Sequence, residues 1–189
     1  GDFIYNSKKI NPKELDKLMQ IASLCNNASI DGPSDPTEKS LLVAARKADY
    51  NKSYPRLKEI PFSSETKFMI TLNKIDSKQF YNIKGAPEIV LNKCTKILIN
   101  NKEIILNKKT KSQILKAYED MASEALRVLG FAYSSDDKNY VFVGLMGMID
   151  PPRKEVKYSV EMCKKAGIKV VIITGDHSIT AKAIAKQIG

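Results

Sequence analysis

The segment FYNIKGAPEIVLNKC, residues 80–94, constrains the fold most, because two kinds of secondary structure meet inside it without a linker. Side chains alternate between two faces along FYNIK, and this period of two predicts a half-buried strand that ends at Lys84. Pro87 and Glu88 suit the first turn of a helix, where proline loses no hydrogen bond and a carboxylate meets the positive end of the helix dipole. We therefore expect Lys84 at a strand-to-helix junction, a place that favours anions. The alternative for this stretch alone is a surface lysine beside a tight turn.

The pattern up to residue 149 predicts an antiparallel sheet flanked by helices. Asp35, Pro36 and Glu38 form a capping box that marks the start of one helix. The expected helices are 12–27, the helix opened by Asp35, the helix from Pro87, and a long helix with apolar residues repeating over 114–126. The expected strands are 56–62, 67–74, 80–84, a short β segment within 95–106, 128–133 and 140–149.

The character of the sequence changes at DPPR, residues 150–153, where two prolines form a stiff, extended joint. Beyond it we expect a helix over 154–165, a continuous apolar strand over 168–174 and a helix from Ser178. The order helix, buried strand, helix is typical of a parallel α/β layer. The predicted fold class is therefore mixed α/β (α+β), with an antiparallel-sheet domain over 1–149 and a partial parallel α/β segment over 150–189.

Composition limits the class of protein. The chain has 189 residues, of which 43% are hydrophobic and 28% charged, as in folded soluble proteins. Its longest apolar run, Val141–Ile149, is far shorter than the roughly 20 residues of a membrane span, and we expect a soluble chain. Cys25, Cys94 and Cys163 lack paired spacing and His177 is the single histidine, so the sequence predicts no metal site and a reduced, cytosolic setting.

The net charge of +10 favours an anionic partner, and charge alone does not choose among a nucleotide, a nucleic acid and an anionic lipid. Most basic residues are lysines spread along the chain, and the few arginines form no compact stripe of the kind that reads nucleic acid. A basic nucleic-acid-binding domain stays the alternative function. It predicts a contiguous positive face and a strongly salt-dependent affinity for long polyanions.

A second candidate site lies in VVIITGDHSITAKAIAKQIG, residues 170–189. Thr174, Gly175 and Asp176 follow the expected strand and precede a helix, at the carboxyl end of a parallel strand where open α/β sheets bind ligands. A threonine hydroxyl can donate to a phosphoryl oxygen, and a glycine lets the backbone approach closely. The alternative is an ordinary helix N-cap by Asp176.

Five ordered motifs carry a resemblance that covers nearly the whole chain: DPTEKSLL, IPFSSETKFM, IKGAPE, GMIDPPR and AGIKVVIITGDHSITAKAIAKQIG. Together they resemble the cytoplasmic head of a P-type ATPase cation pump, most closely the type II group that contains calcium pumps. The resemblance implies a nucleotide-binding domain followed by part of a phosphorylation domain with a haloacid-dehalogenase-like fold. It also implies ATP and Mg²⁺ as cofactors, with the magnesium site mostly outside this chain.

The resemblance also assigns roles to individual residues. The adenine would stack on Phe62, Glu38 would lie near the adenine, and Met69 would lie beside Phe62 across the hairpin. Lys84 would line the pocket while the turn from Gly85 keeps the space beside it open, and Arg127 would reach the phosphates. In the parent pump Thr174, Gly175 and Asp176 would assist the phosphoryl group.

The sequence departs from the family pattern in two respects. Relatives carry an arginine soon after the stacking phenylalanine, where this chain has Ser64 and Thr66 and keeps only Lys67 for the pocket. The motif DKTGT, which holds the phosphorylated aspartate, and the magnesium-binding motif GDGxND do not occur in the sequence. The expectation is therefore a fragment that binds ATP, turns over nothing alone, and serves the phosphorylation, actuator and transmembrane domains of a parent membrane protein.

Two further expectations follow for this fragment. It would lie on the cytoplasmic side of the membrane, with no direct membrane contact and no nucleic-acid partner. A free-standing phosphohydrolase of the same haloacid-dehalogenase-like fold would need its own nucleophilic aspartate at a strand end, and the sequence offers none.

Overall fold

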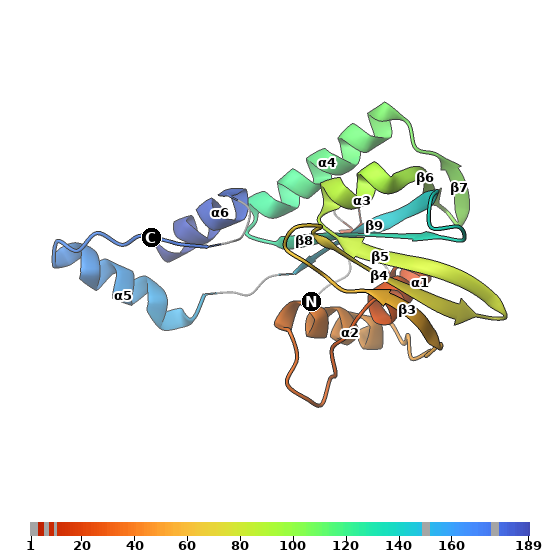
Figure 1. The fold of residues 1–189 in the computed structure, drawn as a ribbon. Coiled ribbons are helices and arrows are strands. Elements are labelled where there is room, and N and C mark those ends of the chain that lie inside the picture. Colours follow the sequence, from red (N-terminus) through yellow and green to blue (C-terminus); the bar gives the residue numbers. More distant parts are fainter. Residues whose placement is uncertain (1–3, 6–7, 10, 149–151, 175–177) are drawn as a thin grey trace. The chain divides into compact units, whose positions relative to one another are not determined.

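The computed structural model describes residues 4–5, 8–9, 11–148, 152–174 and 178–189 (Figure 1). The chain divides into two compact units, one formed by Gly1–Lys111 with Leu129–Met146 and the other by Ser112–Val128 with Gly147–Gly189. The domain boundary that the sequence places near Asp150 stays a prediction, and residues 112–128 also belong to the second unit.

A mostly antiparallel sheet forms the first unit and confirms the mixed α/β fold class. Among the described residues its strands run in the order β3-β4-β5-β8-β9-β6-β7. Their bounds are β3 (Arg56–Ile60), β4 (Phe68–Ile75), β5 (Lys78–Gly85), β6 (Cys94–Ile99), β7 (Lys102–Ile105), β8 (Arg127–Ser134) and β9 (Tyr140–Met148). A separate short ladder pairs β1 (Ile4–Tyr5) with β2 (Lys8–Lys9).

The meander predicted for the first strands is confirmed, since β3, β4 and β5 pair in antiparallel register along the chain. The rest of the order was not predicted. Strand β8 joins the free edge of β5, and β6 pairs with β9 in parallel, so the β6–β7 hairpin lies at the far edge of the sheet. Alternation within a strand shows which side chains share a face but does not choose the neighbouring strand.

Helices cover both faces of this sheet (Figure 1). The helical elements of this region are the 3-10 turn η1 (Pro12–Leu15), α1 (Asp16–Leu24), α2 (Pro36–Lys47) and α3 (Pro87–Lys93). Helix α1 contacts both α2 and β5, and α3 contacts β5 as well. The short loop that joins β5 to α3, predicted from the proline after Lys84, is therefore confirmed: proline occupies the first helical position of α3.

The face of β4 and β5 turned toward α1 is unusually polar for a core. Thr71, Asn73 and Asn82 are each at most 1% exposed, and they bond to one another instead of to water. The Thr71 hydroxyl and the Asn82 amide both donate to Asn73 Oδ1, at 2.9 and 3.0 Å. Because buried polar groups are costly unless paired, this row fixes the register between the two strands and α1.

In the second unit, α5 (Lys154–Lys165) contacts α6 (Ser178–Ile188), and α4 (Lys108–Ser123) enters this unit from residue 112 onward. Both helices expected after residue 153 are thus present. The strand predicted over 168–174 is wrong, because those residues form no ladder and Ile173 is 95% exposed. A strand needs a neighbour for its backbone N–H and C=O groups, and no described residue of this chain pairs with the segment.

Candidate functional site

Lys84 lies at the end of β5, opposite Met69 on β4 and Phe131 on β8. The residue is only 5% exposed, so the alternative of a surface lysine beside a turn is wrong. Its Nζ forms a 2.5 Å ion pair with Glu38 Oε1 on α2. A buried ammonium group is costly unless it is paired, and this carboxylate supplies the pairing.

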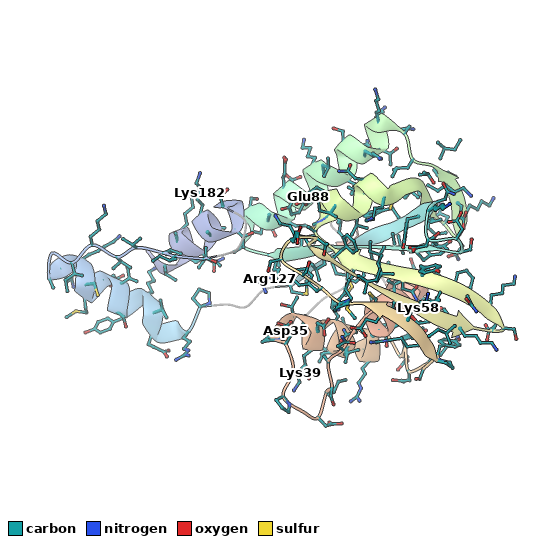
Figure 2. The ribbon with its side chains drawn as sticks, in the orientation of Figure 1. Asp35, Lys39, Lys58, Glu88, Arg127 and Lys182 are labelled. Atoms are coloured by element: carbon teal, nitrogen blue, oxygen red, sulfur yellow. The ribbon has the colours of Figure 1, made fainter. Side chains whose placement is uncertain are left out.

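Glu38 lies in the first turn of α2, where its carboxylate also faces the positive end of the helix dipole. The predicted N-cap is confirmed: Asp35 Oδ1 accepts the Glu38 N–H at 3.0 Å, and Figure 2 shows Asp35 at this end of α2. The capping box differs from the prediction, because Glu38 Oε2 accepts the Asn27 N–H at 3.0 Å. The carboxylate of Glu38 thus bonds to Asn27, in the segment after α1, and to Lys84.

Gly85 follows Lys84 and admits no side chain. A Cβ at this position would lie 2.4 Å from the Lys67 carbonyl oxygen and 2.7 Å from Phe68 Cα. A side chain here would therefore meet Lys67 and the start of β4. That the turn from Gly85 keeps the space beside Lys84 open stays a prediction. The glycine permits this close approach, and the next residue, Ala86, donates its N–H to the Lys67 carbonyl at 2.9 Å.

The loop between β3 and β4 is closed by its own hydroxyl groups. Ser63 Oγ accepts the Thr66 N–H at 3.1 Å, and the Lys67 N–H donates to the Ser63 carbonyl at 2.8 Å. Lys67 is exposed and adopts a φ of 58°, a left-handed conformation that costs a non-glycine residue roughly 1–2 kcal/mol. The bond from Ala86 to Lys67 fastens this loop to the turn after Lys84.

Phe62 lies two residues beyond Ile60, the last residue of β3, and enters this loop. Ile60 pairs with Ile70, next to the row in which Met69 faces Lys84, so Phe62 leaves the sheet at the same end. The side chain is left largely in solvent, at 58% exposure. An exposed aromatic ring is suited to stacking on a planar heterocycle.

Met69 is buried at 1% exposure and lies across from Lys84 on β5, while on the β3 side it is next to Ile70, the partner of Ile60. Its place beside Phe62 across the hairpin stays a prediction. Its backbone carbonyl accepts a hydrogen bond from the Cys25 thiol at 3.4 Å. Burial raises the pKa of Cys25 to about 11, so this thiol stays protonated beneath Lys84. Met69 therefore belongs to the buried core beneath Lys84.

Two of the predicted residues belong to the second unit, and two others lie outside the described residues. Arg127 begins β8, is exposed and belongs to the second unit. Thr174 is exposed and lies in that unit too, outside any strand, while Gly175 and Asp176 lie outside the described residues. The site assembled within the first unit is made by Glu38 and Lys84, with the loop from Phe62 to Lys67 beside them.

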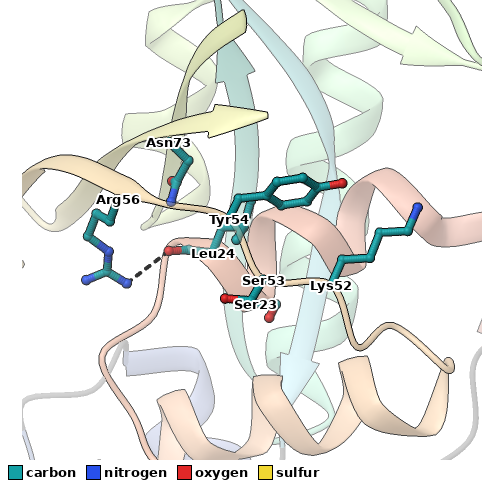
Figure 3. A pocket seen from close by; sticks show the side chains of 7 residues that line it. All are labelled: Ser23, Leu24, Lys52, Ser53, Tyr54, Arg56 and Asn73. Carbon is teal, nitrogen blue, oxygen red and sulfur yellow. Dashed lines mark hydrogen bonds between the residues drawn. The ribbon is translucent and has the colours of Figure 1, made fainter. Parts of the chain in front are cut away.

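A cavity of about 160 Å³ lies elsewhere in the first unit, between the end of α1 and the start of β3 (Figure 3). Its lining residues are Ser23, Leu24, Lys52, Ser53, Tyr54, Arg56 and Asn73. None of the residues predicted from sequence lines it. Arg56 donates to the Leu24 carbonyl at 3.1 Å, the bond drawn in Figure 3, and Lys52 extends in another direction, so the two cations do not converge.

The described residues were compared with the requirements of a metal site and of a membrane span. They contain no group of three or more His, Cys, Asp and Glu side chains placed to hold a metal ion. None of their helices is both long enough and apolar enough to cross a membrane.

Comparison with known proteins now decides the family. The model of "P-type ATPase, cytoplasmic domain N" matches residues 14–155, three quarters of the chain. This chain belongs to the P-type ATPases. Over 91% of its length it is 46% identical to calcium-transporting ATPase 1 of Bacillus cereus, and over its whole length it is 35% identical to the calcium-transporting ATPase of Bacillus subtilis. Over 91% it is 36% identical to the sodium/potassium-transporting ATPase subunit alpha of Drosophila melanogaster.

The chain spans 20% to 24% of the length of these P-type ATPases. It corresponds to a piece of each of them. Lys84, Glu38 and Phe62 all lie within the matched residues.

Proposed function

We propose that this P-type ATPase chain binds ATP at the end of β5, in the space bordered by Lys84, Glu38 and the loop that carries Phe62. The observation that supports it most is the buried Lys84–Glu38 pair. The turn after Lys84 is bonded, from the Ala86 N–H to the Lys67 carbonyl, to the loop that carries the exposed Phe62. Few structural needs account for a lysine that is 5% exposed and held by one carboxylate. A nucleotide has both the base and the anionic groups that such a place recognises.

Each residue has a separate part in this proposal. Phe62 stacks on the adenine, a contact worth about 1–3 kcal/mol per base, and Glu38 accepts from the base or the sugar. Lys84 and the exposed Lys67 meet anionic oxygens, and Arg127 reaches the phosphates. Met69 and Gly85 shape the floor without a direct bond. Mg²⁺ accompanies ATP, and most of its ligands lie outside this chain.

The wider role follows from the family. The chain serves as domain N, over 1–149, with residues 150–189 as a hinge and part of the phosphorylation domain of a cation-transporting pump on the cytoplasmic side of a membrane. It presents ATP to an aspartate that the printed sequence does not contain, and phosphoryl transfer forms an aspartyl-phosphate there. Thr174, Gly175 and Asp176 assist the phosphoryl group. The phosphorylation, actuator and transmembrane domains are its partners.

The transported ion is proposed to be calcium. The relative with the higher identity, 46%, is named for calcium transport. Sodium/potassium-named relatives reach 37%, slightly above the 35% of a second calcium-named relative, so calcium is favoured by the 46% identity of the first relative alone.

The test is calorimetric titration of the chain with ATP, ADP and GTP, with and without magnesium. We expect a Kd of roughly 10⁻⁴–10⁻³ M for ATP, about −5.5 to −4 kcal/mol, and weaker binding of GTP. Phe62→Ala and Lys84→Ala should each abolish measurable binding. The matched controls are Tyr158→Ala, an aromatic 66% exposed in α5, and Lys58→Ala, an exposed lysine of β3 (Figure 2).

A contrary result has a clear form. Binding that ignores the base, survives Phe62→Ala and varies only with ionic strength would mean that the net charge of +10 acts alone. In that case the nucleic-acid alternative replaces the ATP site.

A further inference from the structure

We infer that Arg56 is a positioning residue. It fixes the geometry of the Glu38–Lys84 ion pair through residues 24–27, which end α1 and follow it. The inference deepens the proposed function and rests on it only for the effect on nucleotide affinity. Arg56 is the first residue of β3, and its side chain is 30% exposed. It was not among the residues singled out by sequence, because no spacing or motif marks it.

The guanidinium of Arg56 donates to three residues at the C-terminal end of α1 and just after it, Leu24, Asn26 and Asn27. Its Nη2 donates to the carbonyls of Leu24, at 3.1 Å, and Asn26, at 2.5 Å. Its Nη1 donates to the Asn27 side-chain oxygen and to Glu59 Oε2, the latter at 2.8 Å. Leu24 is the last residue of α1, so its carbonyl has no partner within the helix, and Arg56 supplies one.

Glu59 closes this arrangement into a ring. Asn27 Nδ2 donates to Glu59 Oε1 at 2.6 Å, while Arg56 holds the other carboxylate oxygen. The hydrogen bond from Asn27, then the guanidinium of Arg56, lower the pKa of Glu59 and keep it charged. Asn27 is thereby fixed at its side chain by two residues of β3.

The same segment also holds Glu38, through one backbone and one side-chain donor. The Asn27 N–H donates to Glu38 Oε2 at 3.0 Å, and Asn26 Nδ2 donates to the Glu38 carbonyl at 2.9 Å. Glu38 Oε1 is left for Lys84. The order of contacts is therefore Arg56, Asn27, Glu38, Lys84, and each step is a hydrogen bond or ion pair within the first unit.

Only an arginine can make these contacts together. Its planar fork presents five N–H donors, whereas a lysine ammonium is a point charge that cannot span two carbonyls, an amide and a carboxylate. Arg56→Lys therefore keeps the charge and removes the geometry. We expect residues 25–27 to loosen, Glu38 Oε2 to lose its fixed donor, and the pair with Lys84 to sample several geometries.

The first measurement is made without nucleotide. Amide hydrogen exchange at Asn27 should be roughly tenfold faster in Arg56→Lys than in the parent chain. The matched control is Arg46→Lys, the same change at an exposed residue of the last turn of α2, which should alter exchange at Asn27 less than about twofold. Urea unfolding midpoints for all variants check that the fold is intact.

The second measurement is a double-mutant cycle on ATP affinity. Arg56→Lys should weaken ATP binding roughly 3- to 10-fold in the parent chain and less than about twofold in a Glu38→Ala background. Equal losses in both backgrounds, or unchanged exchange at Asn27, overturn the inference. If the parent chain binds no ATP, the proposed function fails, and exchange at Asn27 still decides whether Arg56 positions Glu38.

Discussion

Gly85→Ala offers the sharpest test of how the junction after β5 is built. The new Cβ would lie 2.4 Å from the Lys67 carbonyl oxygen, and ordinary contact begins near 3.4 Å, so β4 and β5 must separate locally by about 1 Å. That shift strains the Phe68–Gly85 row and the hydrogen bond from Ala86 to Lys67. Overpacking costs about 1–3 kcal/mol and each weakened hydrogen bond about 0.5–1.5 kcal/mol.

The lower chain entropy of alanine in the unfolded state returns about 0.4–1 kcal/mol. The net expectation is a loss of about 0.5–4 kcal/mol in the free energy of unfolding, with a central value of about 2 kcal/mol. Urea titrations followed by far-UV circular dichroism and by tyrosine fluorescence measure it, and agreement of the two probes checks that unfolding is cooperative.

Two other glycines make a graded series with Gly85. At Gly130 the nearest atom to an added Cβ is Pro87 Cα at 3.2 Å, so alanine there should cost about 1 kcal/mol. At Gly32 the nearest atom is 3.7 Å away, and alanine should change stability by no more than about 0.5–1 kcal/mol. A Gly85→Ala chain as stable as the parent, or a Gly32→Ala chain equally destabilised, would refute the reasoning.

Three further predictions concern single side chains. Lys84→Met strands its carboxylate partner, which is 19% exposed, and should cost roughly 2–4 kcal/mol in urea, against less than about 0.5 kcal/mol for Lys58→Met; equal midpoints would contradict the pairing. Asp35→Ala removes the cap of α2 and should cost about 1 kcal/mol, with Asp35→Asn nearly neutral by the same assay. Iodoacetamide followed by mass spectrometry should label Cys163 before the buried Cys25. Because burial raises the pKa of Cys25 from 9.0 to about 11, the unfolded thiol ionises first, and stability should fall as pH rises from about 9 toward 11; a flat profile would exclude this.

Local patterns were enough to predict the elements around Lys84. The alternation before it and the proline after it are set by the period of a strand and the fixed φ of proline, which act within a few residues. The strand, the turn and the helix α3 are confirmed as a result. The N-cap by Asp35 is confirmed for the same reason, since a cap bonds only to the next turn.

The long-range partners could not be predicted in this way. Nothing near Glu38 in the sequence specifies that its carboxylate will bond to Asn27 and Lys84, because those contacts depend on how α1, α2 and β5 pack. A sequence rule favoured the return bond of a capping box, and tertiary contacts replaced it. Arg56 was missed because its role depends on three backbone and side-chain acceptors brought together only by the fold.

The segment 168–174 shows the opposite limit, where a strong local pattern was insufficient. Its apolar run has the composition of a buried strand, yet Ile173 is 95% exposed and no described strand pairs with it. A β-strand satisfies its backbone groups only through neighbours, so composition predicts the capacity for a strand and not its formation.

The polar face of β4 and β5 explains why a charged residue can occupy a buried position near the end of β5. Thr71, Asn73 and Asn82 already form a hydrogen-bonded row under α1, so Lys84 extends a polar strip instead of interrupting an apolar one. The strip ends at Glu38, whose side chain is 19% exposed, so the charge pair lies where solvent begins. A pair placed deeper would cost more to desolvate than its attraction returns, and a pair placed farther out would be screened by water. In the proposed site, an anion at this end of β5 would therefore contact a lysine that Glu38 holds in one place. Only a modest rearrangement of Glu38 would be needed for Lys84 to pair with the anion instead.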